Sequence, residues 1–87
     1  MDSRQLFATN LRRFRNINGL SQEVLALEAG VNRTYLSKIE KGQTYVGLEI
    51  IEKLATALDV QPYEFLVSQR PKPKILRARR GKIVKRR

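Results

Sequence analysis

Apolar residues recur at helical spacing near the start of the chain. Phe7, Leu11 and Phe14 follow an i, i+4, i+7 pattern, which places three large side chains on one face of a helix. The polar residues between them would then lie on the opposite face. We therefore predict a first helix from Ser3 to about Asn18, and the glycine that follows is typical of a helix end.

A second, shorter helix is predicted over residues 22–29. Ser21 is a suitable N-cap, because its hydroxyl can accept a hydrogen bond from the first turn. Leu25 and Ala26 would face inward, and Gly30 would end the helix.

A third helix is predicted to begin after Asn32, another suitable N-cap, and to run to about Lys41. Its apolar face is narrow, because Leu36 and Ile39 are the residues that form it. The other side of this helix is therefore polar, and its outward residues are Arg33, Thr34, Ser37 and Lys38.

Two more helices are predicted before the composition changes. A fourth helix, from about Gly47 to Leu58, has apolar residues at helical spacing, namely Leu48, Ile51, Leu54, Ala55 and Leu58. Pro62 fits the first position of a short fifth helix that contains Phe65 and Leu66. The fold class is therefore all-α, with five helices.

The net charge of +10 is unevenly distributed. Residues 1–68 hold eight Lys or Arg and eight Asp or Glu, whereas residues 69–87 hold ten cations and no acid. We predict a basic C-terminal tail over 69–87, either a disordered arm or, as the alternative, a hairpin that turns near residues 80–81 and is ordered by a partner. Such a tail favours a polyanionic partner. Its predicted contact residues are Lys72, Lys74, Arg77, Arg79, Arg80, Lys82, Lys85, Arg86 and Arg87.

Several classes of chemistry are disfavoured by the composition. The chain has no Cys and no His, which removes the usual zinc ligands, thiol nucleophiles and the common proton shuttle. We expect no metal, no cofactor and no enzymatic activity. We also expect no membrane span, because the sequence contains no long apolar stretch, and no signal peptide. A cytoplasmic location is the resulting expectation.

Residues 22–41 carry the most informative pattern. Two helices that cross at about 90–120° over a turn of three or four residues require particular residue types at the turn. Ala26 is small enough for the next helix to pass over it, Gly30 can adopt positive φ, and Val31 can fill the corner. The pattern therefore predicts a helix-turn-helix.

The surrounding motifs support that prediction. The chain contains, in order, G-L-S-Q at 19–22, L-A at 25–26, G-V at 30–31 and I-E-K-G at 39–42. This series resembles the Cro/C1-type helix-turn-helix family, also called lambda-repressor-like or XRE, over about residues 6–67. The resemblance implies a five-helix DNA-binding domain over 1–68, with the third helix in the major groove of double-stranded DNA. Three positions depart from the family pattern: many members have Pro near Val46, Gly47 is a weaker N-cap than Ser or Thr, and Asp59 replaces the glycine that often ends the fourth helix.

The resemblance also assigns roles to residues. Base-edge contacts fall on the outward residues of the third helix, a phosphate clamp falls on Gln22, and further phosphate contacts fall on the loop after the third helix. Tyr35 would lie against DNA, with packing inside the protein as the alternative. Arg15 and Glu40 match a structural ion pair of the family. The predicted DNA-binding set is Gln22, Asn32, Arg33, Thr34, Tyr35, Ser37, Lys38, Lys41, Gln43 and Thr44.

The function implied is that of a transcriptional regulator, a repressor or autoregulator, that binds a palindromic operator as a homodimer. The predicted dimer surface consists of Val60, Tyr63, Phe65, Leu66 and Val67. Phe65 is also predicted to be a core residue, together with Phe7, Phe14 and Leu54. Two alternatives remain: a protein-binding module, such as an antitoxin that binds a toxin or a coactivator-like adaptor, and an RNA or membrane-surface binder that acts through the tail alone.

Overall fold

The structure, a computed structural model, describes residues 2–68. Within this range the chain forms four α-helices followed by one 3-10 helix, and no strand. Their bounds are α1 Ser3–Ile17, α2 Gln22–Ala29, α3 Arg33–Glu40, α4 Leu48–Leu58 and the 3-10 helix η1 Pro62–Leu66. The predicted basic tail over 69–87 lies outside the described residues.

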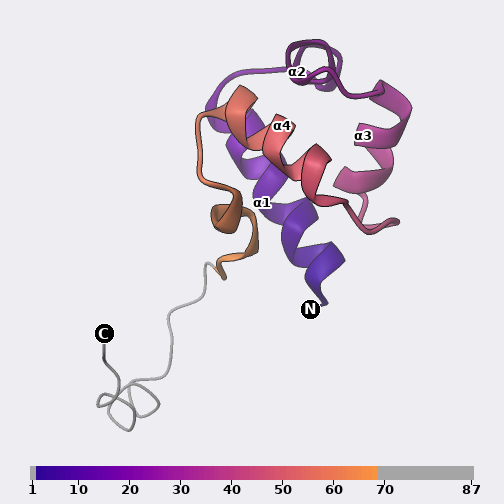
Figure 1. Cartoon of the computed structure of the whole chain (residues 1–87), viewed down its shortest axis with the longest axis vertical. Coiled ribbons are helices and arrows are strands. Elements are labelled where there is room, and N and C mark those ends of the chain that lie inside the picture. The colour runs from indigo at the N-terminus through magenta and orange to yellow at the C-terminus, as the bar shows by residue number, and fades with distance from the viewer. Residues whose placement is uncertain (1, 69–87) are drawn as a thin grey trace, which may run out of the picture.

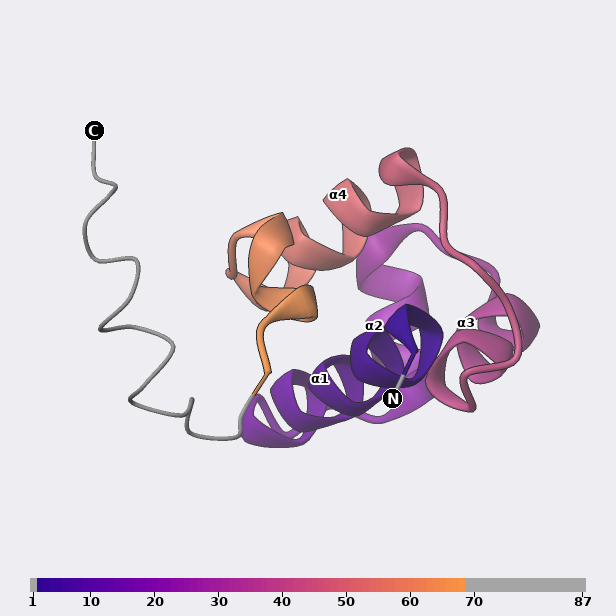
Figure 2. The same ribbon diagram turned by 90° about the horizontal axis from the view of Figure 1, so that it is seen from below.

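The α1 helix lies at the centre of the fold. It packs between α3 on one side and η1 on the other, while α2 contacts both α3 and α4 (Figure 1, Figure 2). A helix this central needs apolar residues along its inner face, and the predicted spacing supplies them: Phe7, Leu11 and Phe14 are all buried.

Side-chain caps determine where the first three helices begin. The Asp2 carboxylate accepts from the Gln5 backbone N–H at 3.1 Å, and the Ser21 hydroxyl accepts from the Val24 N–H at 3.1 Å. Each cap satisfies an N–H that has no partner within its helix. The pKa of the Asp2 carboxyl is lowered, first by this backbone bond and then by the Arg4 guanidinium 3.1 Å away.

The turn between α2 and α3 consists of three residues. Gly30 adopts φ +71°, a left-handed conformation that favours glycine, and the next residue, Val31, is buried in the corner. The backbone N–H of Val31 donates to the Ala26 carbonyl at 2.9 Å, which closes the end of α2. The helix-turn-helix geometry therefore follows from the residue types seen in the sequence.

The fourth helix matches its predicted range, and both of its ends carry residues that depart from the family pattern. Gly47 is its N-cap and makes no side-chain cap bond, as expected for glycine. Asp59 ends it in the left-handed region at φ 57°. The prediction that Leu48 belongs to the apolar face was wrong, because this side chain is 79% exposed at the first helical position, before the packed part of the helix begins.

The η1 segment is held onto α1 by an aromatic cluster. The ring of Phe65 lies 4.7 Å from that of Phe7 and 5.7 Å from that of Phe14, measured between centroids. The buried Asn10 amide donates to the carbonyl oxygens of Phe65 at 2.7 Å and Val67 at 3.1 Å. The predicted fifth helix is thus a five-residue 3-10 helix, whose last turn is fixed by a side chain of α1.

The placement of Phe65 corrects one sequence prediction. This residue was assigned to the dimer surface, but it is fully buried in the core. Tyr63, Leu66 and Val67, from the same predicted surface, are 68%, 50% and 43% exposed. The short helix therefore turns one aromatic residue inward and presents its other apolar residues outward.

Candidate nucleic-acid interface

The polar side of α3 faces away from the core. Leu36 and Ile39 are buried beneath the helix, so the side chains of Arg33, Thr34 and Lys38 are exposed. Ser37 is half-buried. The helix begins where the Asn32 side chain accepts from the Tyr35 backbone N–H at 3.1 Å. Asn32 is thus the N-cap that the sequence predicts, and it does not line the hollow between α2 and α3.

An open hollow of about 300 Å³ lies between the start of α2 and the outward face of α3. Its lining contains three cationic side chains and no carboxylate. The hollow brings together seven of the ten residues predicted to contact DNA, from two helices and the following loop: Gln22, Arg33, Thr34, Ser37, Lys38, Lys41 and Gln43. A polar, cationic surface of this kind suits a phosphate backbone and the acceptor-rich edges of bases.

A buried ion pair lies behind this hollow. Arg15 Nε is 2.7 Å from Glu40 Oε2, and Arg15 Nη2 donates to Glu40 Oε1 at 3.0 Å. The Glu40 side chain is only 3% exposed. These two residues are the pair that the family resemblance implied. The two-point contact joins α1 to the last turn of α3.

Gln22 takes part in the same network, which the sequence did not indicate. Its Nε2 donates to Glu40 Oε1 at 3.0 Å, so the predicted phosphate clamp is anchored inside the protein. Arg12 also reaches α3, because its Nη1 donates to the Glu40 carbonyl oxygen. Only the three-dimensional arrangement shows these contacts, because their partners lie 18 and 28 residues away.

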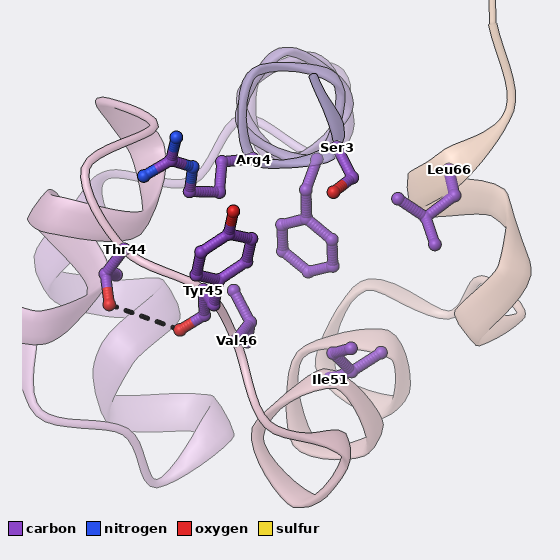
Figure 3. A pocket seen from close by; sticks show the side chains of 8 residues that line it. Ser3, Arg4, Thr44, Tyr45, Val46, Ile51 and Leu66 are labelled. Atoms are coloured by element: carbon purple, nitrogen blue, oxygen red, sulfur yellow. Dashed lines mark hydrogen bonds between the residues drawn. The ribbon is translucent and has the colours of Figure 1, made fainter.

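The loop after α3 is fixed by contacts on both sides. The Tyr35 hydroxyl donates to the Tyr45 carbonyl at 3.3 Å, and the Thr44 hydroxyl donates to the same oxygen at 3.2 Å. Arg4 lies 4.6 Å above the centre of the Tyr45 ring (Figure 3). The sequence assigned Thr44 to DNA contact and Tyr35 either to DNA contact or to packing; in the structure both hydroxyls donate to the Tyr45 carbonyl of this loop.

Within residues 2–68, no cluster of three potential metal-ligating side chains is present. In the same range, no helix is long and apolar enough to cross a bilayer. An open apolar pocket of about 120 Å³ lies beside the Tyr45 loop, bordered by the start of α1, by α4 and by η1 (Figure 3). Its apolar lining offers no acid–base pair and no anchoring charge other than Arg4.

Comparisons with known proteins agree with this geometry. A family model described as helix-turn-helix matches residues 11–65. A hypothetical transcription factor from Neisseria meningitidis is 40% identical over 75 residues, covering 86% of this chain and 71% of the relative. The control protein C.BamHI from Bacillus amyloliquefaciens is 45% identical over 64 residues, covering 72% of this chain and 79% of the relative.

A solved structure gives the same result. The restriction-modification controller protein C.AhdI from Aeromonas hydrophila superposes with a TM-score of 0.69 at 47% identity, covering 71% of this chain and 94% of that one. Sequence and fold therefore agree on a single assignment. The chain belongs to the Cro/C1-type, or XRE, helix-turn-helix family of DNA-binding transcriptional regulators.

Proposed function

We propose that this protein is a sequence-specific transcriptional regulator that reads a palindromic operator in the major groove as a homodimer. The observation that carries the proposal is the cationic hollow, in which the start of α2 and the outward face of α3 meet. Three relatives or structural neighbours are named as control or controller proteins, which favours the same role here. Such a regulator acts on DNA in the cytoplasm.

The residues of the hollow divide into two groups. Arg33 and Lys38 carry the donors that guanine O6 and N7 accept, and the Thr34 methyl group fits against a thymine methyl. Gln22, Lys41 and Gln43 lie around them and contact phosphates, which fixes the position of α3 along the groove. Because phosphate contacts carry no sequence information, base preference would come from α3 alone.

We infer dimerisation from the small number of base pairs that one recognition helix can contact. A single recognition helix contacts too few base pairs for genomic specificity, so two half-sites about one helical turn apart, roughly 34–36 Å, are needed. The exposed apolar residues Tyr63 and Leu66 of η1 support a dimer surface there. Tyr45, whose side chain is 69% exposed, lines the same pocket as Leu66 and extends this surface.

A protein partner such as a toxin is the second candidate, and one observation favours it. Leu27 is 81% exposed and Val24 is 40% exposed, three residues apart on the outer side of α2. These side chains are separate from η1 and would serve a different partner. Co-purification of a second chain that is lost on Leu27→Ser would support this candidate.

The main proposal is tested by selecting bound sequences from random DNA duplexes and footprinting the protein on the selected duplexes. We expect an enriched palindrome whose two halves are protected. Lys38→Ala should lower affinity for that palindrome. Lys53→Ala is a matched control, because Lys53 is exposed on α4, pairs with Glu49 at 3.7 Å and lies outside the hollow. The proposal fails if no sequence is enriched, or if both variants bind equally well.

A further inference from the structure

The carboxylate of Glu40 connects the two parts of the proposed DNA interface. It accepts from Arg15 through both oxygens and from Gln22 Nε2 at 3.0 Å. Arg15 also donates through Nη1 to the Leu20 carbonyl at 2.8 Å, in the segment that leads into α2. One buried network therefore joins α1, the start of α2 and the end of α3.

We propose that Glu40 is a positioning residue for DNA binding: it holds the Gln22 amide ready for a backbone phosphate and fixes that contact relative to the reading face of α3. The proposal rests on the proposed function, and it gives the ion pair a role beyond stabilising the fold.

The chemistry of the three groups supports this role. An ionised carboxylate only accepts hydrogen bonds, so Glu40 requires Gln22 to present its NH2 group inward. One of the two Nε2 hydrogens is used by Glu40, which leaves the second for an acceptor in the hollow that Gln22 also lines. Phosphate oxygens are acceptors, so the orientation imposed by Glu40 is the one that a phosphate needs.

The position of Gln22 adds to the argument. It is the first residue of α2, beside backbone N–H groups that favour an anion. A glutamine side chain loses rotamer freedom when it is fixed. Because Glu40 fixes it before DNA arrives, that cost does not oppose binding. Without Glu40, the amide could turn over and present its oxygen to the phosphate.

A structural role and a positioning role can be separated with a double variant. Replacing a buried ion pair by apolar residues of similar volume often leaves stability unchanged or raises it. The variant Arg15→Met/Glu40→Leu therefore removes the partner of Gln22 without the cost of one unpaired charge. Leu58→Ala is the matched control, because it destabilises the core through a buried residue of α4 that does not line the hollow.

The experiment measures affinity for the selected duplex while single phosphates are replaced by neutral methylphosphonates. Every variant is assayed at a temperature where circular dichroism shows it folded. In the original protein, neutralising one phosphate per half-site should lower the affinity, because Gln22 contacts that phosphate. Gln22→Ala should lower affinity roughly three- to tenfold, the range expected for one hydrogen bond, and should abolish sensitivity at that phosphate.

The double variant should lose sensitivity at the same phosphate, and adding Gln22→Ala to it should cause no further loss. Leu58→Ala should keep the sensitivity. If the double variant does not fold, Arg15→Leu/Glu40→Leu is measured in its place, and the same phosphate should lose its effect on affinity. The proposal is overturned if the Glu40 variant keeps its sensitivity there, or if Gln22→Ala lowers affinity equally in both backgrounds. If the original protein selects no sequence, the proposed function fails as well.

Discussion

Replacing Phe65 tests how η1 is attached to the rest of the fold. The ring is fully buried and contacts two other aromatic rings, at centroid distances of 4.7 and 5.7 Å. An aromatic pair contributes about 0.5–1.5 kcal/mol beyond its buried area. Phe65→Leu keeps an apolar side chain but loses both pairs, so it should lower the free energy of unfolding by about 1–3 kcal/mol.

That loss is large for a domain of this size. A domain of the described length has a free energy of unfolding of roughly 3–10 kcal/mol, from about 0.05–0.15 kcal/mol per residue. Each kcal/mol lost from the free energy of unfolding should lower Tm by about 4–8 °C. Phe65→Ala should cost about 3–5 kcal/mol and leave the protein close to unfolding.

The assay is urea unfolding followed by far-UV circular dichroism at two protein concentrations. Ile17→Ala is the control, because the Ile17 side chain is 68% exposed, lies outside the proposed dimer surface and should change stability by no more than about 0.5 kcal/mol. If Phe65 formed a dimer surface instead, its replacement would mainly weaken association, and its effect would depend on protein concentration. That result, or an equal loss in both variants, would refute the packing argument.

Three further predictions follow from other parts of the chain. Gly42→Ala should lower the urea midpoint, because Gly42 has φ +71° and an added Cβ would meet the Gln5 amide; Gly47→Ala, in open space, is the comparison. Asp2→Asn should lower stability at neutral pH. The pKa of Asp2 is depressed by the Gln5 N–H and by Arg4, so the difference in urea midpoint should close as pH falls through that lowered pKa, below the usual value of about 3.9. Removal of residues 69–87 should weaken binding to all duplexes and reduce its salt dependence, with little change in preferred sequence; a lost preference would contradict this division of roles.

Much of the fold could be predicted from the sequence because its helices are bounded by residues with specific local conformations. Ser21 and Asn32 cap helices that begin at the next residue, and Gly30 makes the turn between them. Leu48 and Phe65 were harder to place. Their exposure depends on how α4 packs against α2 and how η1 packs against α1. A short segment with neighbouring apolar residues does not specify which of them faces inward.

Most residues of the candidate site were predictable, and the family resemblance implied the Arg15–Glu40 pair, but the other hydrogen bonds of the site were not predictable. The outward residues of α3 follow from helical periodicity once Leu36 and Ile39 are assigned to the core. The bond from Gln22 to Glu40 depends on how two helices cross, so no spacing along the chain indicates it. The Tyr35 hydroxyl likewise finds its partner in a loop whose path is set by tertiary contacts.

In the proposed complex, outward side chains of α3 contact base edges, with Arg33 on a guanine. The most direct measurement replaces each guanine of the selected duplex by 7-deazaguanine, which lacks the N7 acceptor, and compares the original protein with Arg33→Ala. The original protein should lose affinity at one guanine per half-site, by about 1 kcal/mol for the lost hydrogen bond, and Arg33→Ala should be insensitive at that position. Equal sensitivity of both proteins at every guanine would contradict the claim.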